Sequence, residues 1–314
     1  MILRVPVTVI GGYLGAGKTT LVNHLLRNAG GLRIAVLVND FGDLPIDADL
    51  IEAQDDDLIS IAGGCVCCSF GSDLMGALMA IAVRDPAPDH ILIEASGVAL
   101  PGSIASAVAL LEAFCVDGVV VLADAETVTA RSADQYMGDT ILRQLGAADL
   151  VIANKADLAG PEKMTRLRAW IANAAPSARL VEAERGRVPI EVVLGLSRAL
   201  ATSDANALLS GPIRNIAEAS DRYETATFTV EDPVDVKRLA HVLADPLSGL
   251  LRSKGIVRDP EGALQVFQVV ANRIEIAPFA GNCATRIACI ALRGRMDRPR
   301  IERAIAGELL PTFG

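Results

Sequence analysis

The sequence predicts an α/β protein in which a doubly wound, mostly parallel sheet is followed by a second, smaller α+β domain. Up to about residue 200, short apolar runs rich in valine and isoleucine alternate with longer helical patterns. Continuous apolar strands separated by helices are typical of a parallel sheet covered on both faces. Beyond residue 221, threonines alternate with apolar residues, which is typical of a half-buried strand.

Each element of the first domain follows from a local pattern. A helix is expected to begin near Lys18 and to stop at the glycine pair Gly30-Gly31, and a later helix is expected to begin at Pro161. Proline is favoured in a first helical turn and glycine just after a last one. The expected strands are residues 5–10, 34–38, 90–93, 118–123 and 150–153.

The chain is expected to divide into a domain of residues 1–205, a linker of residues 206–221 and a domain of residues 222–314. A chain of 314 residues that is 51% hydrophobic and 21% charged can bury one large core and one smaller core. From Thr202 to Ser220 the composition shifts to Ser, Asn, Asp, Ala and Gly with Pro212, which is typical of a linker.

The last domain has weaker signals. A strand is expected over 225–230, an amphipathic helix from Asp232 to about Leu243, and two further strands within 266–276. The run Arg252-Ser253-Lys254-Gly255 and the basic stretch 293–300 are interpreted as solvated surface, with docking of another molecule as the alternative.

Charge and cysteine usage exclude several classes of protein. The 29 Lys and Arg against 38 Asp and Glu give a net charge of -9, which would repel both a nucleic-acid backbone and an anionic membrane surface. No stretch reaches the roughly 18 apolar residues that a membrane span needs. Three of the six cysteines lie within four residues, which is no disulfide framework. We therefore expect a cytoplasmic protein with reduced thiols.

A phosphate-binding loop is expected between the first strand and the first helix. Residues 12–19, GYLGAGKT, fit the pattern G-x-x-x-x-G-K-[ST] in the required context. Such a backbone can turn its N–H groups around phosphate oxygens, and the helix N-terminus adds positive potential. Lys18 is expected to reach the β and γ phosphates and the Thr19 hydroxyl to ligate Mg²⁺. The first domain is thus predicted to be a P-loop NTPase, with a chance glycine turn as the alternative.

A second motif favours guanine over adenine. Asn154-Lys155-Ala156-Asp157 follows the expected strand 150–153, at the edge of the sheet where a base would lie. The Asp157 carboxylate can accept two hydrogen bonds from guanine, whereas adenine offers no such pair of donors. Asn154 can meet N7, and the stem of Lys155 can cover the ring. GTP is therefore the predicted nucleotide.

Two acidic residues follow neighbouring strands and are expected to complete the magnesium site. Glu94 precedes Ala95-Ser96-Gly97, whose Gly97 N–H could meet a γ-phosphate, and Asp40 follows the second strand. Either carboxylate could instead simply end its strand. No glutamine stands in the segment after Glu94 to orient an attacking water, so slow intrinsic hydrolysis is predicted.

The run Gly63-Gly64-Cys65-Val66-Cys67-Cys68 places three thiols within four residues. Three thiolates suit a soft or borderline ion, Zn²⁺ first and Co²⁺ or Cu(I) behind it. The fourth ligand is left open between water, Asp43 and a group on a receiving protein. The alternatives are a buried apolar cluster and a redox switch. The other cysteines, Cys115, Cys283 and Cys289, are interpreted as core packing, and His24 as a satisfied helix residue.

With these motifs in order, the sequence resembles the CobW-like GTPases, relatives of the GTPases that insert nickel into hydrogenase and urease. The resemblance rests on residues 12–20, 39–42, 63–68, 94–97 and 154–157, with a weaker likeness at 252–255. It implies a low-turnover GTPase that binds zinc or cobalt at the three clustered cysteines and delivers it to a client. Two departures are the absence of a histidine-rich linker and the presence of Asp40 and Asp43 where relatives commonly have Glu.

The prediction is therefore a slow GTPase and metallochaperone that delivers zinc to a client metalloenzyme or apo-protein. One alternative is a GTPase chaperone for assembly or reactivation of a metal- or cobalamin-dependent enzyme. Another is a metal-responsive binding module with negligible turnover, and a homodimer stays open. The expected catalytic residues are Lys18, Asp40 and Glu94, and the expected magnesium ligands are Thr19, Asp40 and Glu94. The expected GTP-binding residues are Gly12, Gly15, Ala16, Gly17, Lys18, Thr19, Thr20, Gly97, Asn154, Lys155 and Asp157.

Overall fold

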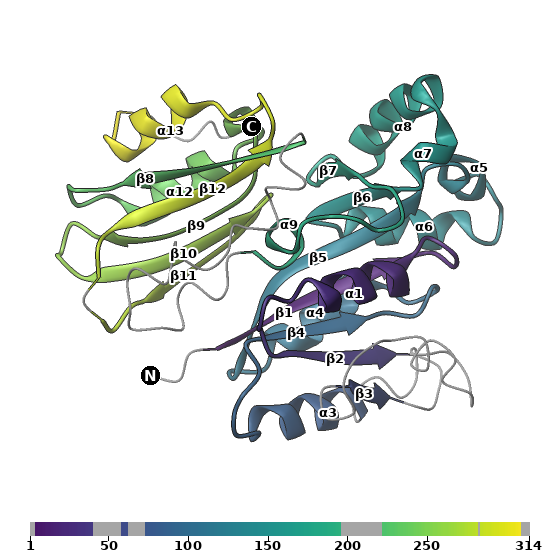
Figure 1. Cartoon of the computed structure of the whole chain (residues 1–314), viewed down its shortest axis with the longest axis horizontal. Helices are drawn as coiled ribbons and strands as arrows, with labels where there is room; N and C mark the ends of the chain where they lie inside the picture. Colours follow the sequence, from purple (N-terminus) through teal and green to yellow (C-terminus); the bar gives the residue numbers. More distant parts are fainter. Residues whose placement is uncertain (1–3, 40–57, 62–72, 196–221, 282, 309–314) are drawn as a thin grey trace. The chain divides into compact units, whose positions relative to one another are not determined.

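The computed structural model describes residues 4–39, 58–61, 73–195, 222–281 and 283–308. The chain forms two compact units, the first spanning Ile2–Leu194 and the second beginning at Gly195 (Figure 1). The predicted linker, residues 206–221, lies outside the described residues. Within the described ranges, no helix combines the length and the apolar composition that crossing a membrane requires.

The first unit is built on a parallel sheet, as predicted. Its described residues form seven strands in the order β3-β2-β4-β1-β5-β6-β7, and every neighbouring pair is parallel. The strands β2, β3 and β4 lie on one side of β1, and β5, β6 and β7 lie on the other side. The strand order therefore reverses beside β1. Ligands of α/β proteins bind at the carboxyl ends of the strands at such a reversal. The strands are β1 (Val5–Gly12), β2 (Ile34–Asn39), β3 (Leu58–Ile61), β4 (His90–Glu94), β5 (Phe114–Asp124), β6 (Leu150–Asn154) and β7 (Arg179–Glu182).

Helices cover both faces of this sheet, which explains why its strands are apolar throughout. α3, α4, α6 and α8 share one apolar cluster with alternate strand residues such as Val7, Val9 and Val121. α1 packs on β1 and β4, and α9 packs on β5, outside that cluster and therefore on the opposite face. The helices are α1 (Lys18–Arg27), α3 (Asp73–Ala82), α4 (Pro101–Ala109), α5 (Val128–Ser132), α6 (Gly138–Gly146), α7 (Ala156–Ala159), α8 (Pro161–Ala174) and α9 (Ile190–Leu194).

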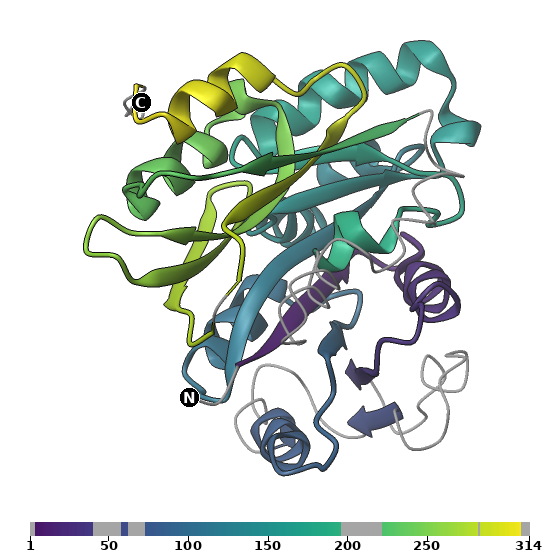
Figure 2. The same ribbon diagram turned by 60° about the vertical axis from the view of Figure 1, so that its left-hand side comes forward.

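The second unit is an α+β domain built on an antiparallel sheet. Its described strands pair in the order β11-β10-β9-β12-β8. α12 and α13 lie on the same side of this sheet (Figure 2) and close a separate core around Phe267. Gly255 in β9 lies so close to Phe267 that an added Cβ would be 2.7 Å from the ring. The elements are β8 (Tyr223–Thr229), α12 (Val236–Ala244), η2 (Pro246–Ser248), β9 (Leu250–Arg258), β10 (Leu264–Val270), β11 (Arg273–Pro278), β12 (Arg286–Leu292) and α13 (Arg298–Ile305).

Two interpretations of this unit were wrong. α12 begins at Val236 and not at Asp232, because the Asp235 side chain accepts the Arg238 N–H at 3.0 Å and caps the helix there. Arg252 and Ser253 are not solvated surface, since they are only 4% and 3% exposed in the central strand β9.

The basic stretch and the scattered cysteines agree with their interpretations only in part. Arg293, Arg295 and Arg298 are exposed as expected, but Arg300 lies 2.7 Å from Asp245 in an ion pair whose side chains are 12% and 10% exposed. Cys289 is buried in the second core as expected, whereas Cys115 and Cys283 are only half-buried.

Candidate nucleotide-binding site

The glycine loop lies between β1 and α1 at the point where the strand order reverses. Gly12, Gly15 and Gly17 have φ angles of 132°, 77° and 100°, which favour glycine. Gly17 also has no room for a side chain, because an added Cβ would lie 2.4 Å from the Asn154 amide nitrogen. Lys18 is 7% exposed, and its Nζ donates to the Gly12 carbonyl at 3.0 Å. The ammonium group of Lys18 is therefore held against the backbone of the glycine loop.

Two of the predicted magnesium ligands meet at the end of this loop. The Thr19 hydroxyl in the first turn of α1 donates to Glu94 Oε1 at 2.8 Å, although the residues are 75 positions apart. Glu94 is 2% exposed at the carboxyl end of β4. Both groups supply hard oxygen atoms, which suit Mg²⁺, and two adjacent ligands of an octahedral Mg²⁺ lie roughly 3 Å apart given bonds of about 2.1 Å. The hydroxyl and carboxylate oxygens thus fit one shared cation.

The loop after Glu94 lies directly against the glycine loop. An added Cβ on Gly97 would be 2.4 Å from Leu14 Cδ2 and 2.9 Å from the Leu14 backbone nitrogen. Only glycine allows this approach. Gln144 of α6 also holds this loop, since its Nε2 donates to the carbonyls of Gly97 and Ala99 at 3.1 and 2.7 Å.

Asn154 joins the guanine motif to the glycine loop. Its Nδ2 donates to the Ala16 carbonyl at 2.9 Å, and its Oδ1 accepts the Gly186 N–H at 2.9 Å. The side chain is thus bonded on both sides in a residue that is 2% exposed. An amide nitrogen carries two hydrogens, so one N–H beyond the bond to Ala16 is left for a base.

Lys155 and Asp157 lie on the rim of the site. Lys155 has a φ of 61°, and its Nζ forms an ion pair with Asp124 at 2.8 Å, while Asp157 is exposed. Burial would raise the pKa of Asp124, but hydrogen bonds from Lys155 and from the Glu126 N–H outweigh it and hold that pKa below its usual range. Asp124 therefore stays ionised and holds the lysine stem in place.

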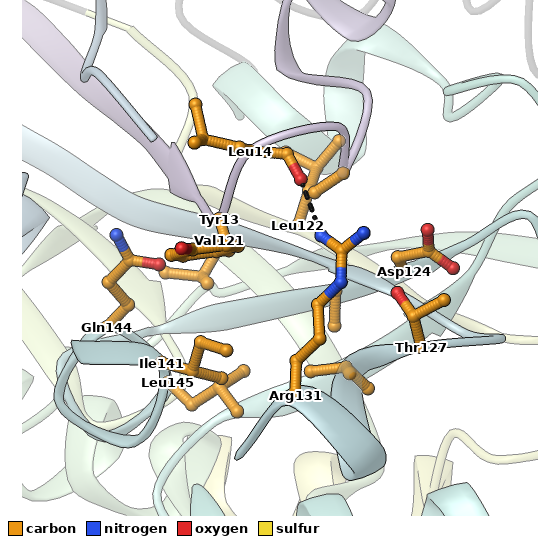
Figure 3. Close-up of a pocket in the computed structure, with 13 residues that line it drawn as sticks. Tyr13, Leu14, Val121, Leu122, Asp124, Thr127, Arg131, Ile141, Gln144 and Leu145 are labelled. Carbon is orange, nitrogen blue, oxygen red and sulfur yellow. Dashed lines mark hydrogen bonds between the residues drawn. The ribbon is translucent and has the colours of Figure 1, made fainter. Parts of the chain in front are cut away.

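A small depression of about 20 Å³ lies beside the glycine loop and is lined by residues of that loop and of β5, α5 and α6 (Figure 3). Arg131 of α5 borders it and donates from Nη1 to the Leu14 carbonyl at 2.9 Å. The same guanidinium lies 5.8 Å from the centre of the Tyr13 ring, within the range of a cation–π contact. Arg131 thus holds the glycine loop at Tyr13 and Leu14.

Several predicted residues lie outside the described residues, namely Asp40, Asp43, Cys65, Cys67 and Cys68. Elsewhere, within the described part of the chain, no cluster of three or more His, Cys, Asp or Glu residues could hold a metal ion. The remaining predicted contacts are both exposed, Gly15 within the glycine loop and Thr20 in the first turn of α1.

His24 is a satisfied helix residue, as interpreted from the sequence. Its Nε2 lies 3.1 Å from the Val188 carbonyl, and burial is the main reason that its pKa is lowered.

Three residues of the site escaped the sequence analysis: Asp124, Arg131 and Gln144. Asp124 had a usable signal, because it ends the strand beside the one that carries the guanine motif. Arg131 and Gln144 belong to helices and have no such signal, since only the packing of α5 and α6 brings them to the two loops.

Two family models match the chain, one over each unit. The model of the CobW/HypB/UreG nucleotide-binding domain matches residues 6–182, and that of the cobalamin synthesis protein CobW C-terminal domain matches residues 223–308.

Individual relatives match over most of the chain. The zinc chaperone CobW of Sinorhizobium sp is 33% identical over 96% of this chain and 96% of its own length. The zinc chaperone YjiA of Escherichia coli is 28% identical over 81% of each chain. The crystal structure of the Zn(II)-bound YjiA GTPase from E. coli covers 98% of this chain and 99% of its own, with 23% identity and a TM-score of 0.45. On the family model and the match to the Sinorhizobium protein, the chain belongs to the CobW/HypB/UreG family of P-loop GTPases.

Proposed function

We propose that this protein is a GTP-binding, slowly hydrolysing metallochaperone that carries zinc on Cys65, Cys67 and Cys68 and delivers it to a client metalloprotein. The observation that supports the nucleotide part best is the 2.8 Å approach of Thr19 Oγ1 to Glu94 Oε1 beneath a glycine loop. A hydroxyl in the first turn of the helix after the loop and a carboxylate at the end of a neighbouring strand of the sheet are the pair that a P-loop GTPase uses for Mg²⁺.

The residues around this pair have separable roles. Lys18 would neutralise phosphate charge, and the Gly97 N–H would hydrogen-bond the γ-phosphate. Asn154 and Asp157 would recognise guanine, with the Lys155 stem against the ring. When bound between Thr19 and Glu94, Mg²⁺ would supply positive charge to the phosphates. Because no described glutamine side chain follows Glu94 in its loop, water is poorly oriented and slow hydrolysis is expected.

Strand order supports coupling between the nucleotide and the cysteines. β2 and β3 are parallel neighbours, with Asn39 paired to Ile61 at their carboxyl ends. The chain therefore leaves β2 toward Asp40 and leaves β3 toward Cys65 at the same edge of the sheet that carries the glycine loop. The relatives named zinc chaperones support zinc as the cargo over Co²⁺ or Cu(I).

A zinc titration with a chelating indicator tests the proposal. Zinc affinity is expected to differ by about tenfold between the protein bound to a non-hydrolysable GTP analogue and the protein bound to GDP, as typical coupling energies allow. Cys67→Ser should abolish the tight site, while Cys115→Ser serves as the matched control. Equal affinities in both nucleotide states would remove the coupling.

Two further measurements separate the alternatives. Client activation that survives Cys67→Ser would indicate an assembly or reactivation GTPase whose cysteines are structural. Negligible GTP hydrolysis with and without zinc would indicate a metal-responsive binding module.

A further inference from the structure

Gln144 is a buried polar side chain that the proposed chemistry does not use. It is 1% exposed, and its Nε2 donates to the carbonyls of Gly97 and Ala99. Both hydrogens of the amide nitrogen are therefore directed at the loop that follows Glu94. The helix α6, which follows β5 and α5 in the chain, thus holds this loop. Loss of the two N–H donors would leave two buried carbonyls without these partners.

The loop that Gln144 holds is one of two that meet where a γ-phosphate would lie. Gly97 packs against Leu14 of the glycine loop with no space for a Cβ. Leu14 is held in turn by Arg131, which donates to its carbonyl at 2.9 Å. Arg131 and Gln144 come from the consecutive helices α5 and α6 and border the same depression (Figure 3).

We propose that Gln144 is a positioning residue for γ-phosphate recognition, acting by holding the Gly97 N–H in place. The inference rests on the proposed function, because it requires that the chain binds GTP. Arg131 differs, since the glycine loop that it holds would contact the β-phosphate as well. Loss of Gln144 should therefore weaken the triphosphate alone, whereas loss of Arg131 should weaken both nucleotides.

Titration of the full chain with fluorescent GDP and with a fluorescent non-hydrolysable GTP analogue tests this difference. Gln144→Leu is expected to weaken the analogue by about tenfold and GDP by less than about twofold, since about 1.4 kcal/mol corresponds to a tenfold change. Arg131→Ala should weaken both to a similar extent. Arg143→Ala should weaken neither, because Arg143 is the residue before Gln144 on α6 and pairs at the surface with Asp139 at 2.9 Å.

A second measurement needs no substitution. Hydrogen exchange of the wild-type chain should show the Gly97 amide protected by the triphosphate analogue and not by GDP.

The two proposals fail in different ways. Wild-type protein that binds neither nucleotide would overturn the proposed function itself. Wild-type protein that binds both, with equal losses for GDP and the analogue in Gln144→Leu or no protection of Gly97, would overturn the role of Gln144 and leave the GTPase assignment standing.

Discussion

Replacing Asn154 by alanine should destabilise the first unit because it breaks two buried hydrogen bonds at once. The amide bridges the Ala16 carbonyl and the Gly186 N–H, each at 2.9 Å. Leaving a buried donor or acceptor unsatisfied costs about 1–3 kcal/mol. For the two groups together we expect the free energy of unfolding to fall by about 2–6 kcal/mol. GDP affinity should fall as well, because the glycine loop loses its anchor.

Tryptophan fluorescence can measure this change in the first unit alone. Trp170 is the one tryptophan of the 314-residue sequence, and it lies in α8, partly buried against the core of the first unit. Urea unfolding followed at this residue therefore does not report on the second unit. With a slope of about 2 kcal/mol per M, the midpoint should fall by about 1–3 M.

Asn173→Ala is the matched control, because it removes the same side chain from the exposed face of α8. Asn173 Nδ2 donates only to the Ala169 carbonyl, at 3.0 Å. Its midpoint should stay unchanged or rise slightly, since alanine is the better helix former. If Asn154→Ala and Asn173→Ala unfold at the same urea concentration, the bridging role derived for Asn154 is wrong.

Substitutions at three other positions, Glu191, Asp124 and Gly97, have outcomes set by the structure. Burial raises the pKa of Glu191, so its contribution to the free energy of unfolding is present at acid pH and is lost as the pH rises through the folded pKa. Glu191→Gln should therefore match wild type near about pH 4 and should unfold at a higher urea concentration than wild type near about pH 8. Asp124 has a lowered pKa, so its share is present at neutral pH and is lost as the pH falls through the folded pKa. Asp124→Asn should lower stability by about 1–3 kcal/mol at neutral pH, because Lys155 loses its ionised partner, and urea midpoints should converge with wild type in acid. Gly97→Ala should weaken a GTP analogue by about tenfold or more in calorimetry, and Leu14→Ala should not restore binding, because the added Cβ also meets the Leu14 backbone nitrogen at 2.9 Å.

The predictable part of the fold is the part that is buried on both faces. All five expected strands of the parallel sheet are confirmed, because central strands need long apolar runs. β3 (Leu58–Ile61) and β7 (Arg179–Glu182) were missed, and they are the two edge strands with four residues each. Edge strands are short and tolerate charge, so they lack the run that reveals a central strand. β9 was missed for another reason, since it buries Arg252 in a central position.

The site divides in the same way between what local sequence encodes and what packing supplies. The glycine loop and the guanine motif are contiguous in sequence because consecutive backbone groups or a single turn must contact one ligand. Gln144 could not be found in this way, because its partners lie 45 and 47 residues earlier in the chain. Its neighbours on α6 give only the pattern of a helix that packs on a sheet.

Strand order also limits how a metal signal can reach the nucleotide. β4 lies between β2 and β1, so Glu94 at its carboxyl end stands between the strand that leads to Asp40 and the strand that leads to the glycine loop. Within the sheet, a change that begins at β3 or β2 can therefore reach the glycine loop through β4 and the loop that Glu94 opens. Gln144 holds that same loop through the carbonyls of Gly97 and Ala99. We therefore expect Gln144→Leu to reduce the difference in zinc affinity between the GTP-analogue and GDP states while leaving the three thiols able to bind zinc, and an unchanged difference would show that the coupling takes another route.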